Sequence, residues 1–382
     1  MKIPYGRQEI TREDIDSVVE VLQSDFLTQG PKIAEFEREF SNYIGAEYAV
    51  AVSNGTAALH LCAMALEVNA SSRVITTPIT FAASANCVRY QQGEVQFCDI
   101  DEKTYCIDLQ KLRAMLEENP KGTFQGVIPV DFAGHPVNTS EIHELARQYD
   151  LWTIEDACHA PGGYYRDAHQ QEQKSGNARY TDLAIFSFHP VKHIAAGEGG
   201  MITTNNEKLY KRLLNLRTHG ITKSKELMQE DHGGWYYELH ELGYNYRLTD
   251  IQAALGLSQL KRAETNLQKR HAIADAYDKA FAGLPIKLPR RSPSAFHALH
   301  LYVILTSRRK ELYDYLKEKN IFTQVHYIPL HYMPYYKQLG FKKGDFPVAE
   351  RYYEQCLSLP MYPSMTQQEM DYVISCVNQF YR

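Results

Sequence analysis

Lys192 and Asp156 are the side chains whose types and positions most suggest chemistry. Lys192 lies between an apolar run at 183–188 and a glycine-rich segment at 197–200, and Asp156 directly follows an apolar run at 151–155. An isolated lysine is usually a solvated charge, and a buried lysine beside a carboxylate can be a plain ion pair. A buried primary amine can also attack a carbonyl carbon and carry protons.

The segment from Ser53 to Thr56 precedes a nearly all-apolar helical run at 57–66. Small and hydroxyl residues at such a helix start leave N–H groups free to bind an anion, and the helix dipole reinforces the attraction. An ordinary helix cap would look the same. Together with a lysine and an aspartate at strand ends, however, an anion site indicates a phosphorylated aromatic cofactor held by its phosphate, ring nitrogen and aldehyde. That cofactor is pyridoxal 5'-phosphate (PLP).

Each residue type suits PLP. The amine of Lys192 can bond to the cofactor aldehyde, and burial lowers the pKa of such an amine. The carboxylate of Asp156 would keep the pyridine nitrogen protonated, so that the ring can accept electrons. Phe81 follows the run at 73–78 and could stack on the ring, although it could equally be a core phenylalanine.

The elements that must position these residues follow from the apolar pattern. Strands are predicted at 73–78, 94–100, 126–132, 151–156 and 183–188, and helices at 108–119 and 139–150. Strands that alternate with helices indicate an α/β fold with a mostly parallel sheet. Because ligands bind beyond the carboxyl ends of such strands, Asp156 and Lys192 are expected to share a cleft.

A helical stretch at 257–284 is followed by a proline- and arginine-containing connector at 285–297. A chain of 382 residues is long enough for one large domain and one smaller domain. We expect a large cofactor-binding domain with an N-terminal arm at 1–260 and a smaller α/β C-terminal domain at 261–382. The boundary would fall inside the long helix.

Composition excludes several classes of function. A net charge of -5 with dispersed basic residues argues against a nucleic-acid partner. The sequence shows neither a leader pattern nor an apolar run of about 18 residues, so we expect no membrane partner and a cytoplasmic location. The seven cysteines contain no CxxC pair and are expected to be reduced thiols.

Many spaced segments resemble, in order and over nearly the full length, the DegT/DnrJ/EryC1/StrS family of nucleotide-sugar aminotransferases. They are GPKIAEFEREF, SNGTAALHL, TTPITF, EDACHA, SFHPVKHIAAGEGG, GYNYRLTDIQAALGLSQL, VHYIPLH and LSLPMYP. The resemblance implies the fold type I PLP-dependent aminotransferase fold. TTPITFAASAN, SFHPVK, HLYVIL and VHYIPLHYMPYY are most similar to the pseudaminic acid branch of the family.

The resemblance supports the roles of Lys192, Asp156 and Phe81 and adds others. It implies that the cofactor is held by Gly55, Thr56, Phe81, Asp156, His159, Ser187, Lys192 and Asn245, with His159 beside the cofactor 3-hydroxyl. Asn245 would come from the neighbouring subunit, which implies a homodimer with shared active sites. Arg247 would bind the donor carboxylate, although a surface salt bridge is the plain alternative.

For the sugar nucleotide, the resemblance indicates Tyr5, Phe26, Leu27, Thr28, His326 and Tyr327. A metal site at His326 and His331 would lack further ligands, so no metal is expected. The implied reaction transfers the amino group of L-glutamate to the C4 ketone of a UDP-linked 4-keto-6-deoxy-N-acetylhexosamine. Lys192 would act as acid and base in both halves of that reaction.

Three alternatives stay open. The acceptor could be a dTDP- or GDP-linked sugar, or a C3 ketone. The enzyme could be a PLP-dependent 3-dehydratase, a class in which histidine replaces the lysine; Lys192 disfavours this, although His193 is adjacent. The chain could also be a non-catalytic regulator, but the complete set of Thr56, Asp156, Lys192 and Asn245 counts against that.

Overall fold

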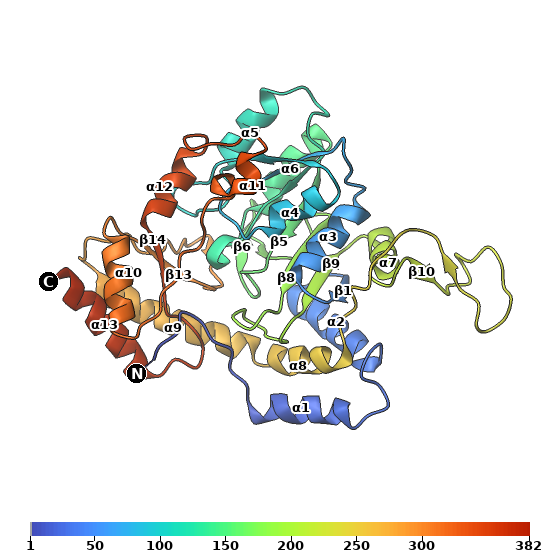
Figure 1. Ribbon diagram of the computed structural model, residues 1–382, viewed down its shortest axis with the longest axis horizontal. Coiled ribbons are helices and arrows are strands. Elements are labelled where there is room, and N and C mark those ends of the chain that lie inside the picture. Colours follow the sequence, from blue (N-terminus) through green and yellow to red (C-terminus); the bar gives the residue numbers. More distant parts are fainter. Residues whose placement is uncertain (1) are drawn as a thin grey trace.

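The computed structural model describes residues 2–382, and its centre is a seven-stranded sheet of order β1-β9-β8-β5-β4-β2-β3 (Figure 1). Neighbouring strands from β3 to β8 are parallel, whereas β9 is antiparallel to both β8 and β1. The mostly parallel α/β sheet is as predicted. The strands are Tyr48–Val52 (β1), Arg73–Thr76 (β2), Glu94–Phe97 (β3), Gly126–Ile128 (β4), Trp152–Asp156 (β5), Leu183–Ser187 (β8) and Gly200–Thr204 (β9).

Both faces of this sheet are buried. In β1, Val50 and Val52 belong to the hydrophobic cluster that includes α3 (Gly55–Ala65), and Ala49 and Ala51 belong to the one that includes α2 (Pro31–Ile44) and α8 (Asp250–Leu260). Successive strand residues point to opposite faces, so burial on both sides requires nearly continuous apolar runs. The strand-forming runs of the sequence have that pattern.

The predicted helices at 108–119 and 139–150 correspond to α5 (Leu109–Glu117) and α6 (Thr139–Tyr149). Asp108 and Asn138 cap them by accepting hydrogen bonds from first-turn N–H groups. The other helices are α1 (Arg12–Leu22), α4 (Ala83–Tyr90), α7 (Glu207–Leu216), α10 (Arg309–Glu318), α11 (Pro334–Lys337), α12 (Pro347–Gln355) and α13 (Gln367–Tyr381), with short 3₁₀ turns η1 (Phe132–Gly134) and η2 (Leu330–Tyr332).

The prediction of a single long helix at 257–284 is wrong. The stretch is split between α8, which begins earlier, and α9 (Ala263–Phe281), with a break at 261–262. At the break, Arg262 leaves helical geometry (φ -113°, ψ 11°), and its guanidinium bonds to the buried carboxylate of Asp14 in α1, with Nη1 at 2.8 Å from Oδ1. This tertiary contact fixes the break, and no local pattern signals it.

The C-terminal part contains β13 (Tyr302–Leu305) paired antiparallel with β14 (Cys356–Leu359). Residues of these strands share a hydrophobic cluster with α9, α10 and α13, and Ile3 from the N-terminal arm joins it. The domain boundary near residue 260 remains a prediction.

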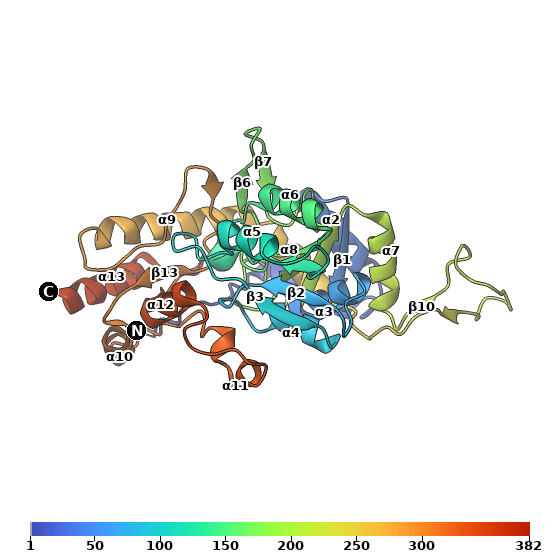
Figure 2. The same ribbon diagram turned by 90° about the horizontal axis from the view of Figure 1, so that it is seen from above.

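Two smaller sheets lie outside the central one. β6 (Tyr164–Arg166), β7 (Glu172–Lys174) and β12 (Ala295–Phe296) form one, and β10 (Ile221–Thr222) and β11 (Glu238–Leu239) form a hairpin that projects from the body in both views (Figures 1 and 2). Trp235 in the hairpin is 76% exposed. Over residues 2–382, we find no helix with the length and apolar character needed to cross a membrane.

Candidate active site

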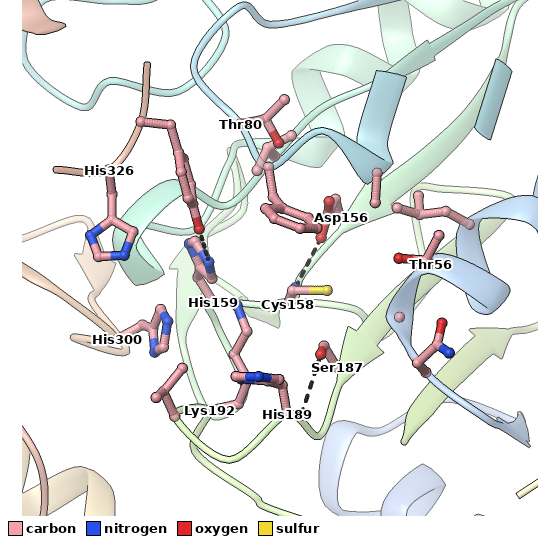
Figure 3. A pocket seen from close by; sticks show the side chains of 18 of the residues that line it. Thr56, Thr80, Asp156, Cys158, His159, Ser187, His189, Lys192, His300 and His326 are labelled. Carbon is pink, nitrogen blue, oxygen red and sulfur yellow. Dashed lines mark hydrogen bonds between the residues drawn. The ribbon is translucent and has the colours of Figure 1, made fainter. Parts of the chain in front are cut away.

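Asp156 and Lys192 line one cavity of about 580 Å³. Asp156 is the last residue of β5, and Lys192 follows the neighbouring parallel strand β8, so both lie at the carboxyl edge of the sheet. Figure 3 shows Thr56, from the start of α3, across the cavity from Lys192. The other predicted residues that line the cavity are Tyr5, Gly55, Phe81, His159, Ser187, His326 and Tyr327.

The start of α3 forms one end of the cavity. Asn54 caps the helix by accepting a 2.8 Å hydrogen bond from the N–H of Ala57, which leaves the first-turn amides of Gly55 and Thr56 as donors at the cavity wall. A Cβ added to Gly55 would lie 3.0 Å from Cβ of Ser187. A larger residue would therefore fill the gap between these amides and the Ser187 hydroxyl, where an anion can bind.

Asp156 is a buried carboxylate with oriented partners. Its Oδ2 accepts a 2.7 Å hydrogen bond from the Ser84 hydroxyl, and its Oδ1 accepts one of 3.2 Å from the N–H of Cys158. Ser84 belongs to the motif at 76–86 but had no predicted role. The two hydrogen bonds fix the orientation of the Asp156 carboxylate.

Burial lowers the pKa of Lys192, while Cys158 and Asp156 act in the opposite direction. A lowered pKa increases the fraction of uncharged amine, which is the nucleophilic form. His193 does not line the cavity, and its Nε2 lies 2.8 Å from the carbonyl oxygen of Ala298.

His159 is 4% exposed and neutral, because burial lowers the pKa of its imidazole well below the ordinary value. Its Nδ1 accepts a hydrogen bond of 3.2 Å from the N–H of Ala133, so the ring proton lies on Nε2. Nε2 lies 3.3 Å from the hydroxyl of Tyr327, and this contact joins the sheet edge to the C-terminal part.

Phe81 is 61% exposed, so the alternative that it is a core residue is wrong. Its ring centroid lies 6.3 Å from that of Tyr327. The cavity also contains residues to which the sequence analysis gave no role, and most of these lie within the motifs that carried the resemblance. Among them are Thr80, Cys158, His189, Val191, Glu198, Tyr246 and His300, whereas Asn54 belongs to the predicted anion site at 53–56.

Phe26, Leu27, Thr28, Asn245 and Arg247 do not line the cavity of their own chain. Asn245 is exposed, and Phe26 and Leu27 are 53% and 47% exposed. The two segments nevertheless meet: Thr28 forms a β-bridge with Thr249, and the N–H of Asp250 bonds to the carbonyl of Leu27. The loop at 26–28 therefore lies beside residues 249–250, which follow Asn245 and Arg247 closely in the chain.

Two further carboxyl groups, Asp131 and Glu155, are buried near Asp156 but outside the cavity lining, at 0% and 3% exposed. Burial raises the pKa of Asp131 to about 7 and raises the pKa of Glu155 well above its ordinary value. Oδ2 of Asp131 has no protein hydrogen-bond partner. The two groups interact and hold a proton at neutral pH.

The cavity fits PLP and offers no metal site. The amides of Gly55 and Thr56 with Ser187 can hold a phosphate, the carboxylate of Asp156 can pair with a protonated ring nitrogen, and the amine of Lys192 can meet an aldehyde. Within the part of the chain that the structure describes, no three His, Cys, Asp or Glu side chains are grouped to hold a metal ion.

Comparison with known proteins adds independent information. Residues 8–378 match the DegT/DnrJ/EryC1/StrS aminotransferase family. The chain is 40% identical to the spore coat polysaccharide biosynthesis protein SpsC of Bacillus subtilis, with 98% of this chain and 96% of that protein aligned. It is 37% identical to the UDP-4-amino-4,6-dideoxy-N-acetyl-β-L-altrosamine transaminase of Campylobacter jejuni, over 97% of this chain and 95% of that protein. The PLP-form of Spr1654 from Streptococcus pneumoniae has a TM-score of 0.88 at 30% identity, covering 98% of this chain and 97% of that chain.

Proposed function

We propose a substrate and a subunit arrangement for this chain, which belongs to the DegT/DnrJ/EryC1/StrS aminotransferase family and is a PLP-dependent sugar aminotransferase. The proposed donor is L-glutamate, and the acceptor is the C4 ketone of a UDP-linked 4-keto-6-deoxy-N-acetylhexosamine. The product is a UDP-4-amino-4,6-dideoxy sugar of pseudaminic acid biosynthesis. The observation that carries this choice is the full-length similarity to the transaminase of Campylobacter jejuni.

We assign a separate role in the reaction to each of three residues of the cavity. Bound PLP supplies a carbonyl group that bonds to amines and a ring that accepts an electron pair. Lys192, with its lowered pKa, takes up the proton that leaves Cα of glutamate and later returns a proton to C4 of the sugar. Asp156 would pair with the protonated ring nitrogen, and Phe81 would lie against the ring face.

The sugar nucleotide would contact Tyr5, His326 and Tyr327. Tyr5 and His326 pack together with ring centroids 5.4 Å apart, and all three line the cavity. Burial lowers the pKa of His326 to about 3, so its imidazole is neutral and suited to an uncharged hydroxyl or carbonyl group.

Amino transfer is favoured over 3-dehydration by the position of Lys192. A dehydratase of this family type would present a histidine at the place of the lysine, but here the lysine lines the cavity and His193 does not.

We further propose that two copies of the chain share their sites. Asn245 and Arg247 precede the segment that meets the loop at 26–28, and neither lines the cavity of its own chain. Exposed apolar side chains at Phe26 and Leu27 suit burial against a second copy. Such an interface would then deliver Asn245 to a phosphate and Arg247 to a donor carboxylate in the other chain.

Product analysis tests the substrate. The enzyme is incubated with PLP, L-glutamate and UDP-, dTDP- and GDP-linked 4-keto and 3-keto sugars, and products are identified by mass spectrometry and NMR. We expect 2-oxoglutarate and a 4-amino sugar from the UDP-linked 4-keto substrate, and none with Lys192→Ala. Preference for another nucleotide or for a C3 ketone, or loss of water without glutamate consumption, would contradict the proposal.

A further inference from the structure

His300 lines the cavity and is 5% exposed. Its ring lies against that of His159, with centroids 4.3 Å apart and planes inclined by 34°, and Figure 3 shows it on the same side of the cavity as Lys192. Burial lowers the pKa of His300 well below its ordinary value, so the ring is neutral. Its Nδ1 is buried without a protein hydrogen-bond partner. The ring face is therefore the part of His300 that makes a defined contact.

The local backbone geometry places the His300 side chain against His159. Leu299 adopts a left-handed conformation (φ 51°), and its N–H bonds to Nδ1 of His297 at 2.9 Å. The N–H of Ala298 bonds to the carbonyl of Gly134 at 2.7 Å. A Cβ on Gly134 would lie 2.9 Å from the amide nitrogen of His300, so glycine is needed for this approach.

Arg270 donates hydrogen bonds to the backbone of the same segment. It is 2% exposed, and its Nη1 lies 3.2 Å from the carbonyl oxygens of both Leu299 and His300. Within residues 2–382 it forms no salt bridge. On the Lys192 side, His193 bonds to Ala298. The segment at 297–301 is thus tied to the sheet edge, to the Lys192 loop and to α9.

We propose that His300 is a positioning residue, whose ring face holds the imidazole of His159 as the Nε2–H tautomer directed at Tyr327. The N–H of Ala133 sets the tautomer as long as it meets Nδ1, and a ring that tilts away from this N–H loses the bond and, with it, the single tautomer. The ring of His300 lies against that of His159, with the planes inclined by 34°, and restricts this tilting. The consequence for the cofactor rests on the proposed role of His159 beside the 3-hydroxyl.

Two substitutions separate the ring face from the ring nitrogens. His300→Phe keeps a flat aromatic face, and His300→Leu keeps an apolar side chain of similar size without one. In the full-length protein with ¹⁵N-labelled histidine and no cofactor, NMR reports the His159 tautomer, assigned with His159→Gln. The PLP dissociation constant is then measured by fluorescence titration.

Wild type and His300→Phe should show a single His159 tautomer and PLP dissociation constants that agree within about twofold. His300→Leu should show mixed tautomers and bind PLP about tenfold more weakly, the size of a lost aromatic contact. The proposal is overturned if His300→Leu matches wild type in the tautomer measurement, or if His300→Phe is as impaired as His300→Leu. Because the tautomer is measured without PLP, this result does not depend on the proposed function. An altered tautomer with an unchanged PLP affinity would contradict only the cofactor role of His159.

His331→Leu is the matched control. His331 is a fully buried imidazole outside the cavity, bonded to Glu350 at 3.0 Å. Its loss should lower the melting temperature while leaving the His159 tautomer and PLP affinity unchanged. An altered His159 NMR signal in this variant would show that any loss of stability changes the His159 tautomer. That result would overturn the assignment to His300.

Discussion

The hydroxyl of Ser84 donates a 2.7 Å hydrogen bond to Oδ2 of Asp156, and the hydroxyl of Thr80 lies 2.7 Å from the Ser84 oxygen. A hydroxyl has one proton, so the Ser84 proton on Asp156 requires Thr80 to donate to Ser84. The N–H of Cys158 occupies the other carboxylate oxygen. This chain of donors orients the carboxylate of Asp156.

Ser84→Ala should therefore weaken catalysis while leaving the fold intact. A hydrogen bond to a charged group contributes about 1.5–3 kcal/mol, so kcat should fall roughly ten- to hundredfold. Ser41→Ala is the control, since it removes a hydroxyl bonded to the carbonyl of Arg38, away from the cavity. Equal kcat values in the two variants would show that Ser84 does not support Asp156.

Asp156→Asn should retain the fold but lose the charge opposite the cofactor nitrogen. An amide cannot keep that nitrogen protonated, so turnover should slow by about 10²-fold or more. Single-turnover absorbance changes after addition of glutamate measure the effect. A wild-type rate would place the electrostatic role on another residue.

The buried carboxyl groups of Asp131 and Glu155 predict a pH dependence of stability. Their pKa values are raised on folding, so above about pH 4 the folded state binds more protons than the unfolded state. The contribution of these two groups to the free energy of unfolding is then fully present below about pH 4 and is lost as the pH rises through about 7. Glu155→Gln replaces one of the two titrating carboxyl groups with an amide that does not titrate. The amide N–H can donate a hydrogen bond to Oδ2 of Asp131, which lacks a partner.

Thermal unfolding of cofactor-free protein tests this. Glu155→Gln should melt about 1–2 °C above wild type at pH 8, the shift expected for about 1 kcal/mol in a chain of 382 residues, and at the same temperature as wild type near pH 4. A difference in melting temperature between the two proteins that is the same at pH 4 and pH 8 would contradict the raised pKa values of Asp131 and Glu155.

The fold and most of the cavity could be predicted because they depend on local patterns. Apolar runs predicted five of the seven strands of the central sheet, all except β1 and β9, and topology then brought Asp156 and Lys192 to one edge. The break between α8 and α9 could not be predicted, because it depends on the contact of Arg262 with Asp14, 248 positions away in sequence. His300 was missed for a related reason: its place depends on the close approach at Gly134 and on the buried Arg270.

Subunit mixing tests the shared site. Lys192→Ala and the double variant Asn245→Ala, Arg247→Ala should each be inactive alone. After random exchange of equal amounts, half of the dimers are mixed and one site in each is intact, so about one quarter of wild-type activity should return by two-fold symmetry. No recovery, with exchange confirmed by mass spectrometry, would place both residues in the site of their own chain.

The most direct test of the central claim is to locate the cofactor on the chain. The protein is saturated with PLP, reduced with borohydride to fix the cofactor on the amine to which it is bonded, digested and mapped by mass spectrometry. We predict one modified lysine, Lys192, with modification absent in Lys192→Ala and prevented when glutamate converts the cofactor to its amine form before reduction. Modification of another lysine, or no modification of Lys192 at saturating PLP, would contradict the account.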